Sequence, residues 1–150
     1  MNPAGHLPLS VKQIRLVRES LESLMEWDTS VVQLFYGRLF EIAPETRALF
    51  KIDIHEQSTK LMETLRVTVD ALDRFEELVP VLADLGRKHG TYGVQAYQYE
   101  KLRSALLWAM GQALGLEFDG ETRAAWDRLI VIVSAVMLEA SAQSMADQTH

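Results

Sequence analysis

Residues 34–50 read LFYGRLFEIAPETRALF, a stretch in which apolar side chains recur every three or four residues up to a proline. This spacing places the apolar side chains on one face of an α-helix, and it predicts a helix from about Ser30 to Ile42. Pro44 then opens a short helical turn that reaches Phe50, because proline is tolerated at the first position of a helix. The stretch therefore predicts a tight helical corner that ends in an aromatic residue.

The same helical periodicity continues on both sides of this corner, while sustained alternation with a period of two is scarce. Ser10 and Gln13 form a predicted capping box for a first helix that reaches about Met25. Four further helices are expected at about residues 56–71, 76–88, 96–114 and 121–145. The predicted fold class is therefore all-α.

Glycine and aspartate residues mark two expected helix ends. Gly90 and Gly93 are predicted to end the helix that begins near residue 76, and Asp119 is a candidate N-cap for the last helix. The sequence contains no internal repeat and no interdomain linker, and 150 residues can bury a single core. We expect one domain at residues 10–146, between tails at 1–9 and 147–150.

The composition argues against several classes of function. The chain has no cysteine, which removes disulfides, thiolate metal sites and cysteine nucleophiles and fits a reducing compartment. A formal net charge of −6, with no run of lysine and arginine, argues against a nucleic-acid partner. The most apolar run, at residues 129–138, has about half the length needed to cross a bilayer, and the start of the chain has no signal-peptide pattern. The expected location is cytoplasmic, with no membrane partner.

A second motif, LGRKHGTYGV at residues 85–94, places His89 at the C-terminal edge of a predicted helix. A groove between this helix and the helix at 56–71 would be lined by Leu61, Leu65 and Leu85, which suits a flat apolar group. Two interpretations of His89 stay open at this point. It is either a metal ligand that faces such a group or a basic residue that interacts favourably with the helix dipole.

Nearly the whole chain resembles the globin family, in its single-domain bacterial haemoglobin and neuroglobin-like branch. In LFYGRLFEIAPETRALF, Tyr36 matches the distal tyrosine, Pro44 the corner proline and Phe50 the phenylalanine that stacks on haem. The segment HEQSTKLMETL resembles the distal helix, with Gln57 in the distal polar position. LGRKHGTYGV resembles the proximal helix, and His89 follows Gln57 by 32 positions, as this branch would have it.

The resemblance implies a globin fold of seven to eight helices around a pocket for haem b, with His89 as the iron ligand. Leu85 would pack under the porphyrin ring, Val94 would cover its edge, and Leu61 would lie one turn after the distal glutamine. Lys60 would pair with a haem propionate. These residues, together with Phe50 and Tyr99, are the expected cofactor contacts.

Two positions decide how the iron would be tuned. Tyr99 matches a family tyrosine that hydrogen-bonds near the proximal histidine beside a glutamate of the last helix, but Ser141 stands where that glutamate would be. Glu139, two residues away, lies on the wrong face of a helix, so the strong electron push of peroxidase-like chemistry is not expected. His55 would point about 200° around the helix from Gln57, so the sixth coordination site is expected to be open or occupied by water. Ligation by His55 would require the start of the helix to rearrange.

The resemblance favours reversible O₂ binding for carriage, storage or scavenging, with Tyr36 and Gln57 as hydrogen-bond donors and with CO and NO as further ligands. An enzymatic alternative is nitric oxide dioxygenation, which would depend on a separate reductase because the sequence has no nucleotide-binding fingerprint. A gas sensor that acts through a partner protein is a third possibility. The fourth is a haem-free helical bundle used for interaction. Simple binding is favoured over catalysis, and no residue is assigned a catalytic role.

Overall fold

The computed structural model describes residues 9–26, 30–49, 54–91 and 94–148. All regular structure in these residues is helical, so the predicted all-α class is confirmed. The elements in chain order are α1 (Val11–Glu26), α2 (Ser30–Ile42), η1 (Pro44–Leu49), α3 (Ile54–Asp70), η2 (Leu72–Arg74), α4 (Phe75–Thr91), α5 (Ala96–Leu114), η3 (Gly115–Glu117) and α6 (Gly120–Gln148), where η denotes a short 3₁₀ helix.

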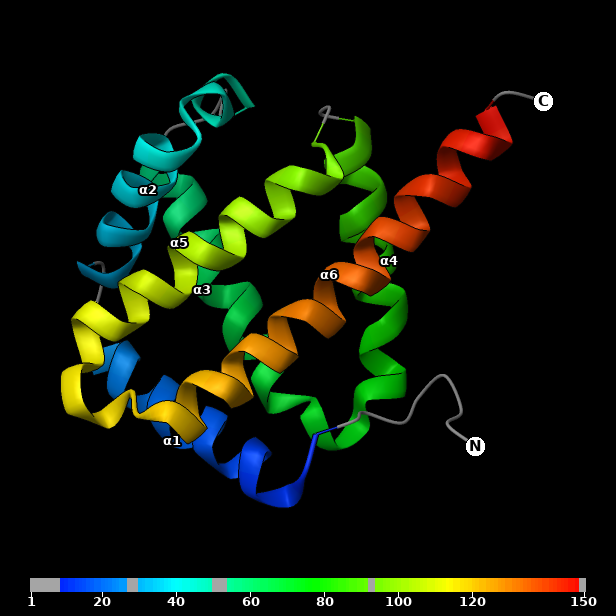
Figure 1. Cartoon of the computed structure of the whole chain (residues 1–150). Helices are drawn as coiled ribbons and strands as arrows, with labels where there is room; N and C mark the ends of the chain where they lie inside the picture. Colours follow the sequence, from blue (N-terminus) through cyan, green and yellow to red (C-terminus); the bar gives the residue numbers. More distant parts are fainter. Residues whose placement is uncertain (1–8, 27–29, 50–53, 92–93, 149–150) are drawn as a thin grey trace.

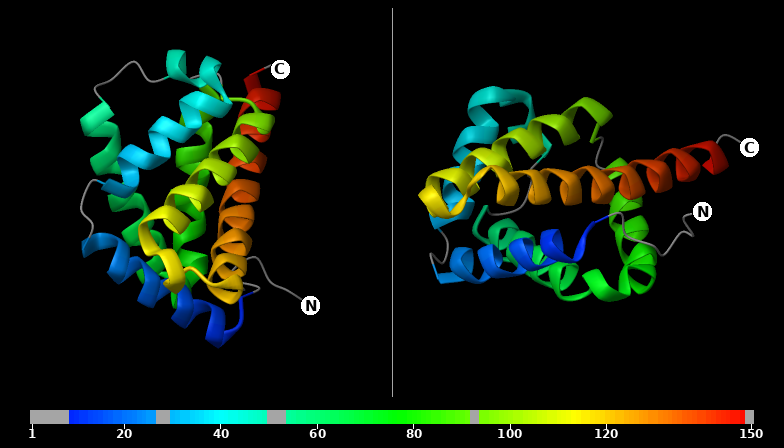
Figure 2. Two further views of the ribbon diagram at one scale, coloured as in Figure 1. Left: turned by 60° about the vertical axis from the view of Figure 1, so that its left-hand side comes forward. Right: turned by 60° about the horizontal axis from the view of Figure 1, so that its bottom comes forward.

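The helices form two layers. In Figure 1, α5 and α6 both run from the η3 turn at the lower left toward the upper right, with α3 behind α5 and α4 behind α6. In the right-hand view of Figure 2, α5 and α6 lie above α1 and α3. The most extensive helix–helix interfaces join α4 to α6 and α2 to α5. The two layers therefore enclose the core, and α4 is held mainly by the last helix.

Both predicted N-caps are present. The Ser10 hydroxyl accepts a hydrogen bond from the Gln13 backbone N–H at 3.0 Å, and the Gln13 side chain accepts one from the Ser10 N–H at 2.9 Å. The Asp119 carboxylate accepts the Thr122 backbone N–H at 2.8 Å, which lowers the pKa of Asp119. Each contact satisfies a backbone donor that has no partner within its own helix.

The core contains one buried polar contact that ties the first helix to the last. Trp126, on α6, is fully buried, and its Nε1–H donates to the hydroxyl of Ser20 on α1 at 2.8 Å. The same hydroxyl donates to the carbonyl oxygen of Leu16 at 2.7 Å. The serine thus satisfies the indole N–H, which would otherwise be costly to bury.

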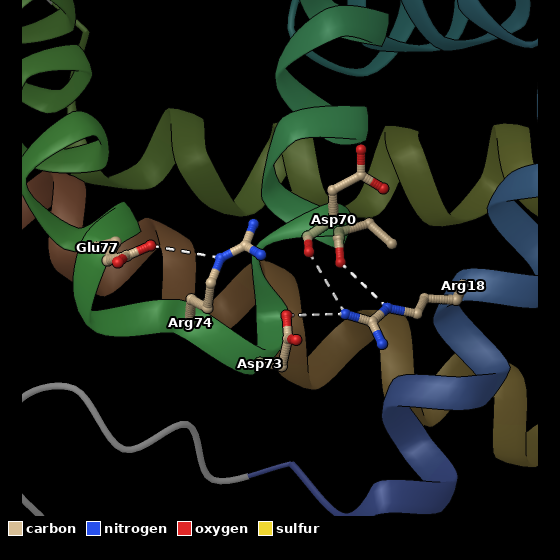
Figure 3. Close-up of polar contacts among 6 residues, drawn as sticks. Arg18, Asp70, Asp73, Arg74 and Glu77 are labelled. Atoms are coloured by element: carbon tan, nitrogen blue, oxygen red, sulfur yellow. Dashed lines mark hydrogen bonds and ion pairs between the residues drawn. The ribbon is translucent and has the colours of Figure 1, made fainter.

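Within the described residues, α3 and α4 make no extensive contact with each other, although both contact the η2 corner that joins them. Arg18 of α1 reaches this corner (Figure 3). Its Nε donates to the carbonyl oxygen of Val69 at 3.4 Å, and its Nη2 donates to Asp73 Oδ1 at 3.2 Å. The first helix, α1, therefore stabilises the junction between α3 and α4, the two helices that carry the candidate site.

Some helix boundaries differ from those predicted. The α4 helix continues through His89 and Gly90 to Thr91, so the prediction that Gly90 ends it is wrong. Glycine is unfavourable inside a helix by about 1 kcal/mol, but packing against α6 overrides this preference. The α3 helix begins two residues earlier than expected, at Ile54, and α6 extends to Gln148. Among the described residues, no helix is long and apolar enough to span a membrane.

Candidate functional site

His89 lies in the last turn of α4 and is half-buried. Its Nδ1 lies 2.7 Å from the carbonyl oxygen of Leu85, one turn earlier. A carbonyl oxygen can only accept a hydrogen bond, so Nδ1 must carry the proton and donate it. In a neutral ring the lone pair is then on Nε2, the nitrogen directed away from the helix backbone. A hydrogen bond of this kind fixes both the orientation and the tautomer of a metal-binding histidine.

Tyr99 of α5 lies beside His89, with the two ring centroids 6.4 Å apart. Tyr99 is buried, and its hydroxyl oxygen has no hydrogen-bond partner among the described residues. Burial also raises the pKa of this phenol. A buried hydroxyl that lacks a partner is uncommon in folded proteins, and it fits a polar or aromatic group held next to His89. No described residue of the last helix bonds the Tyr99 hydroxyl, and Ser141 stands where the family has a glutamate.

Tyr36 of α2 is buried, with 5% of its surface exposed. Its ring stacks on Phe40 at a centroid distance of 5.9 Å, and the guanidinium of Arg47 lies 5.0 Å from the centre of the Phe40 ring. Burial raises the pKa of Tyr36 to about 12. The phenol therefore keeps its proton at neutral pH and can donate a hydrogen bond.

The apolar candidates lie at the margin of the core. Leu61, Leu85 and Val94 are half-buried and pack against the core. Leu61 also lines a small cavity of about 10 Å³, with entirely apolar walls from α1, α2, α3 and α5. These half-exposed apolar side chains on α3, on α4 and before α5 fit the edge of a flat apolar group.

The remaining candidates are less well defined. Lys60 is on the exposed face of α3. Phe50 lies outside the described residues, and so do the side chains of Gln57 and His55, although the backbone of both belongs to α3. The structure thus brings His89 and Tyr99 together. The side chain of Gln57, which is predicted to share the distal site with Tyr36, lies outside the described residues.

Sequence reasoning missed the main-chain partner of His89. A carbonyl oxygen leaves no trace in residue identity, so the role of the Leu85 carbonyl could come only from coordinates. The close approach of α4 to α6 at Gly86 and Gly90 was also missed. Its signal was available, since two glycines one turn apart share a helix face.

The metal-binding side chains of the site suit a metal that is already held by a prosthetic group. No cluster of three or more His, Asp or Glu side chains able to hold a metal ion occurs in the described part of the chain. His89 offers a single free nitrogen, beside a buried aromatic residue and near half-exposed apolar side chains. This donor set fits the class of haem proteins in which a single histidine holds the iron.

The chain belongs to the globin family, whose sequence profile matches residues 33–137. It is 30% identical over 154 residues to neuroglobin of Chaenocephalus aceratus, covering 93% of this chain and 97% of that protein. It is 24% identical over 145 residues to a flavohemoprotein of Bacillus cereus, covering 95% of this chain but 36% of that protein. An engineered carbene transferase from Rhodothermus marinus superposes with a TM-score of 0.85 at 26% identity, covering 95% of this chain and 99% of that structure.

The family membership confirms the resemblance found in the sequence and the globin fold. A globin is a haem-binding protein, and its ligands are diatomic gases.

Proposed function

We propose that this globin binds haem b through His89 and reversibly binds O₂ for carriage, storage or scavenging in the cytoplasm. The observation that carries the proposal is the 2.7 Å contact between His89 Nδ1 and the Leu85 carbonyl oxygen. This contact leaves the lone pair of Nε2 free to bind a metal. When bound, the haem supplies an iron atom at which a diatomic gas can bind. The chain supplies the axial nitrogen and the surroundings of that iron.

We assign the distal hydrogen bonds to Tyr36 and Gln57. Support for Tyr36 is its burial and a pKa of about 12, which together keep a protonated phenol in a dry environment. Hydrogen bonds are stronger where water is excluded, so such a donor would slow the release of a ligand that accepts it. Gln57 is assigned from the resemblance alone.

The other cofactor contacts are assigned by position. Leu61, Leu85 and Val94 would cover the apolar faces and edge of the porphyrin, and their half-buried positions support this role. Tyr99 would contact the proximal side, next to His89. Phe50 would stack on the porphyrin, and Lys60, on the exposed face of α3, would pair with a propionate.

The hydrogen bond to Leu85 favours gas binding over peroxidase-like chemistry. A carboxylate partner would draw the proton from Nδ1 and make the imidazole a stronger electron donor. The partner observed for His89 is a neutral carbonyl. A neutral imidazole gives a weaker electron push, which suits reversible binding.

Nitric oxide dioxygenation by this chain is the second candidate, favoured by its similarity to the engineered Rhodothermus marinus protein, which is described as a putative nitric oxide dioxygenase. In this reaction NO and O₂ combine to give nitrate, and one electron is taken from the ferrous protein. A separate reductase would have to return that electron in each cycle. Consumption of NO by the ferrous, O₂-loaded protein with regeneration only when a reductase is added would support this activity.

The proposal is tested by absorption spectra of the purified protein in the ferric, ferrous and ferrous-CO states. We expect a Soret band in each state and a single broad visible band in the deoxygenated ferrous protein, as for an open sixth site. Split visible bands would instead indicate an internal ligand, and their loss in His55→Ala would identify it. Absence of any Soret band after haem addition would support the haem-free bundle.

The axial ligand is tested with His89→Gly, which should bind haem weakly unless free imidazole is added. His55→Gly is the matched control, and it should keep the haem content of the wild type. A His89→Gly protein with wild-type haem content and an unchanged ferrous-CO spectrum would contradict the assignment.

A further inference from the structure

Gly86 and Gly90, one turn apart on α4, face α6 at a close helix crossing. A Cβ atom on Gly86 would overlap the carbonyl oxygen of Met137 and lie 2.5 Å from the Met137 Cα. A Cβ atom on Gly90 would overlap the hydroxyl of Ser141, at 3.3 Å from its Cβ. Met137 and Ser141 are also one turn apart, so two turns of α4 lie directly against two turns of α6.

The two glycines differ in what blocks a side chain. At Gly86 the obstacle is the main chain of α6, which cannot yield without a shift of one helix relative to the other. At Gly90 the nearest obstacle is a serine hydroxyl, which can rotate away about one bond. Gly86 therefore sets the distance between α4 and α6, whereas Gly90 mainly accommodates one side chain.

The position of Gly86 is linked to the orientation of His89 by the peptide bond between residues 85 and 86. This peptide unit is planar, so the Leu85 carbonyl oxygen and the Gly86 Cα move together. The Leu85 oxygen is the acceptor for the His89 Nδ1–H. One peptide unit thus touches the backbone of α6 on one side and holds the imidazole on the other.

We propose that Gly86 is a positioning residue for the axial histidine: its contact with the Met137 main chain fixes the Leu85 carbonyl, which in turn orients His89. The inference rests on the proposed role of His89 as the haem ligand. A side chain at position 86 displaces this carbonyl and weakens the hydrogen bond. The imidazole Nε2 then becomes a weaker electron donor to the iron, because hydrogen bonding at one ring nitrogen raises the basicity of the other.

The test compares Gly86→Ala with two matched controls, Gly90→Ala on the same helix and Gly37→Ala on α2, where a Cβ atom would have no neighbour within 4 Å. The first measurement is the iron–histidine stretching band of the deoxygenated ferrous protein in resonance Raman spectra. Gly86→Ala should shift this band to lower frequency, and both controls should leave it at the wild-type position. An unchanged band in Gly86→Ala would overturn the proposal.

A second measurement follows the His89 ring N–H proton by NMR in the diamagnetic ferrous-CO protein. This proton should exchange with solvent several-fold faster in Gly86→Ala than in the wild type and the controls. Adding Met137→Ala should not restore slow exchange, because the obstacle is the main chain of Met137 rather than its side chain. Restoration by Met137→Ala would overturn the proposal.

Two outcomes cover a variant that binds haem poorly. If Gly86→Ala keeps its helical circular dichroism but needs free imidazole to hold haem, the positioning role is supported. If it loses its helical signal while Gly90→Ala keeps it, the role is overturned and the contact serves the stability of the whole fold. A wild-type protein with haem but without an iron–histidine band would instead refute the proposed function, independently of Gly86.

Discussion

At the scale of single residues, the burial and ring contacts of Tyr36 support its proposed role as a hydrogen-bond donor to a bound gas. Its ring contacts those of Phe35 and Phe40, at centroid distances of 4.9 Å and 5.9 Å. Two neighbours on the same helix thus restrict the ring, and burial keeps the phenol protonated. A restrained donor loses little side-chain entropy when it forms a hydrogen bond.

Tyr36→Phe should speed O₂ dissociation roughly 10- to 150-fold, since a buried hydrogen bond to a charged acceptor contributes about 1.5–3 kcal/mol. CO dissociation should barely change, because CO gains much less negative charge than O₂ on binding. Gln57→Leu should act in the same direction with a smaller effect. Stopped-flow dissociation rates for both gases measure this. Phe40→Leu is the control for packing, and equal changes for O₂ and CO in Tyr36→Phe would mean that Tyr36 acts by bulk alone.

The raised pKa of Tyr36 also leads us to expect a loss of stability at alkaline pH. The pKa of this phenol is raised from its ordinary value of 10.0 to about 12 in the folded protein. Between these values the unfolded chain binds fewer protons than the folded chain, so the free energy of unfolding falls as the pH rises. The contribution is fully present below pH 10.0 and is lost by about pH 12.

Tyr36→Phe should flatten this alkaline decline by on the order of 1 kcal/mol, after a discount for partial solvent screening. Urea titrations at several pH values between 10.0 and about 12 measure the difference. Tyr97→Phe is the control at a tyrosine that is 49% exposed, and its effect should be smaller. Parallel curves for the wild type and Tyr36→Phe would show that the buried phenol does not resist ionisation.

At the scale of helices, the corner between α3 and α4 depends on Arg18. Its guanidinium bonds the carbonyl oxygens of Val69 and Asp70 near the C-terminus of α3 and the carboxylate of Asp73 in η2 (Figure 3). Carbonyl groups in the last turn of a helix lack partners within the helix, so the arginine acts as a cap supplied by another helix.

Arg18→Ala should lower the free energy of unfolding by about 1 kcal/mol, mainly through the lost carbonyl contacts, because exposed ion pairs contribute little. Arg74→Ala is the matched control at the same corner. Arg74 is half-exposed and pairs with Glu77 at 3.4 Å, so its loss should cost less than about 0.5 kcal/mol. Urea denaturation compares the two variants, and equal losses would show that Arg18 does not cap α3.

The sequence predicted the elements better than it predicted their ends. Periodicity located α2 and α5 at their observed bounds. It misplaced the end of α4 because glycine is a local stop signal, whereas the continuation through Gly90 depends on α6, which lies about fifty residues away in the chain. Local rules cannot register a contact of that kind.

The sequence could predict which residues form the candidate site, but not the contacts that these residues make. Family resemblance selected His89 and Tyr99, and the structure places their rings side by side. It could not supply the Leu85 carbonyl as the partner of His89, because every residue has a carbonyl group. The resemblance supplied the family tyrosine at Tyr99 but not its glutamate, because Ser141 stands at that position, and the Tyr99 hydroxyl has no partner among the described residues.

At the scale of the whole molecule, the core contains a small apolar cavity between α1, α2, α3 and α5. Leu106 lines this cavity and is buried. Leu106→Ala would enlarge a space that already exists, and it should cost about 2–5 kcal/mol of stability. Leu116→Ala is the control at a fully exposed leucine, and it should change stability by less than about 0.5 kcal/mol. Thermal and urea unfolding measure both, and similar costs would contradict the observed packing.

The acceptor that orients His89 is a main-chain oxygen, and it is present whatever amino acid occupies position 85. Substitution at position 85 can change the packing of this side chain but cannot delete the acceptor, so His89 Nδ1 keeps its hydrogen-bond partner whichever side chain stands at position 85. A saturation scan of α4 would record position 85 as a packing site and overlook its electronic role. Replacing the amide between residues 85 and 86 with an ester, by chemical synthesis, would weaken the acceptor without altering any side chain.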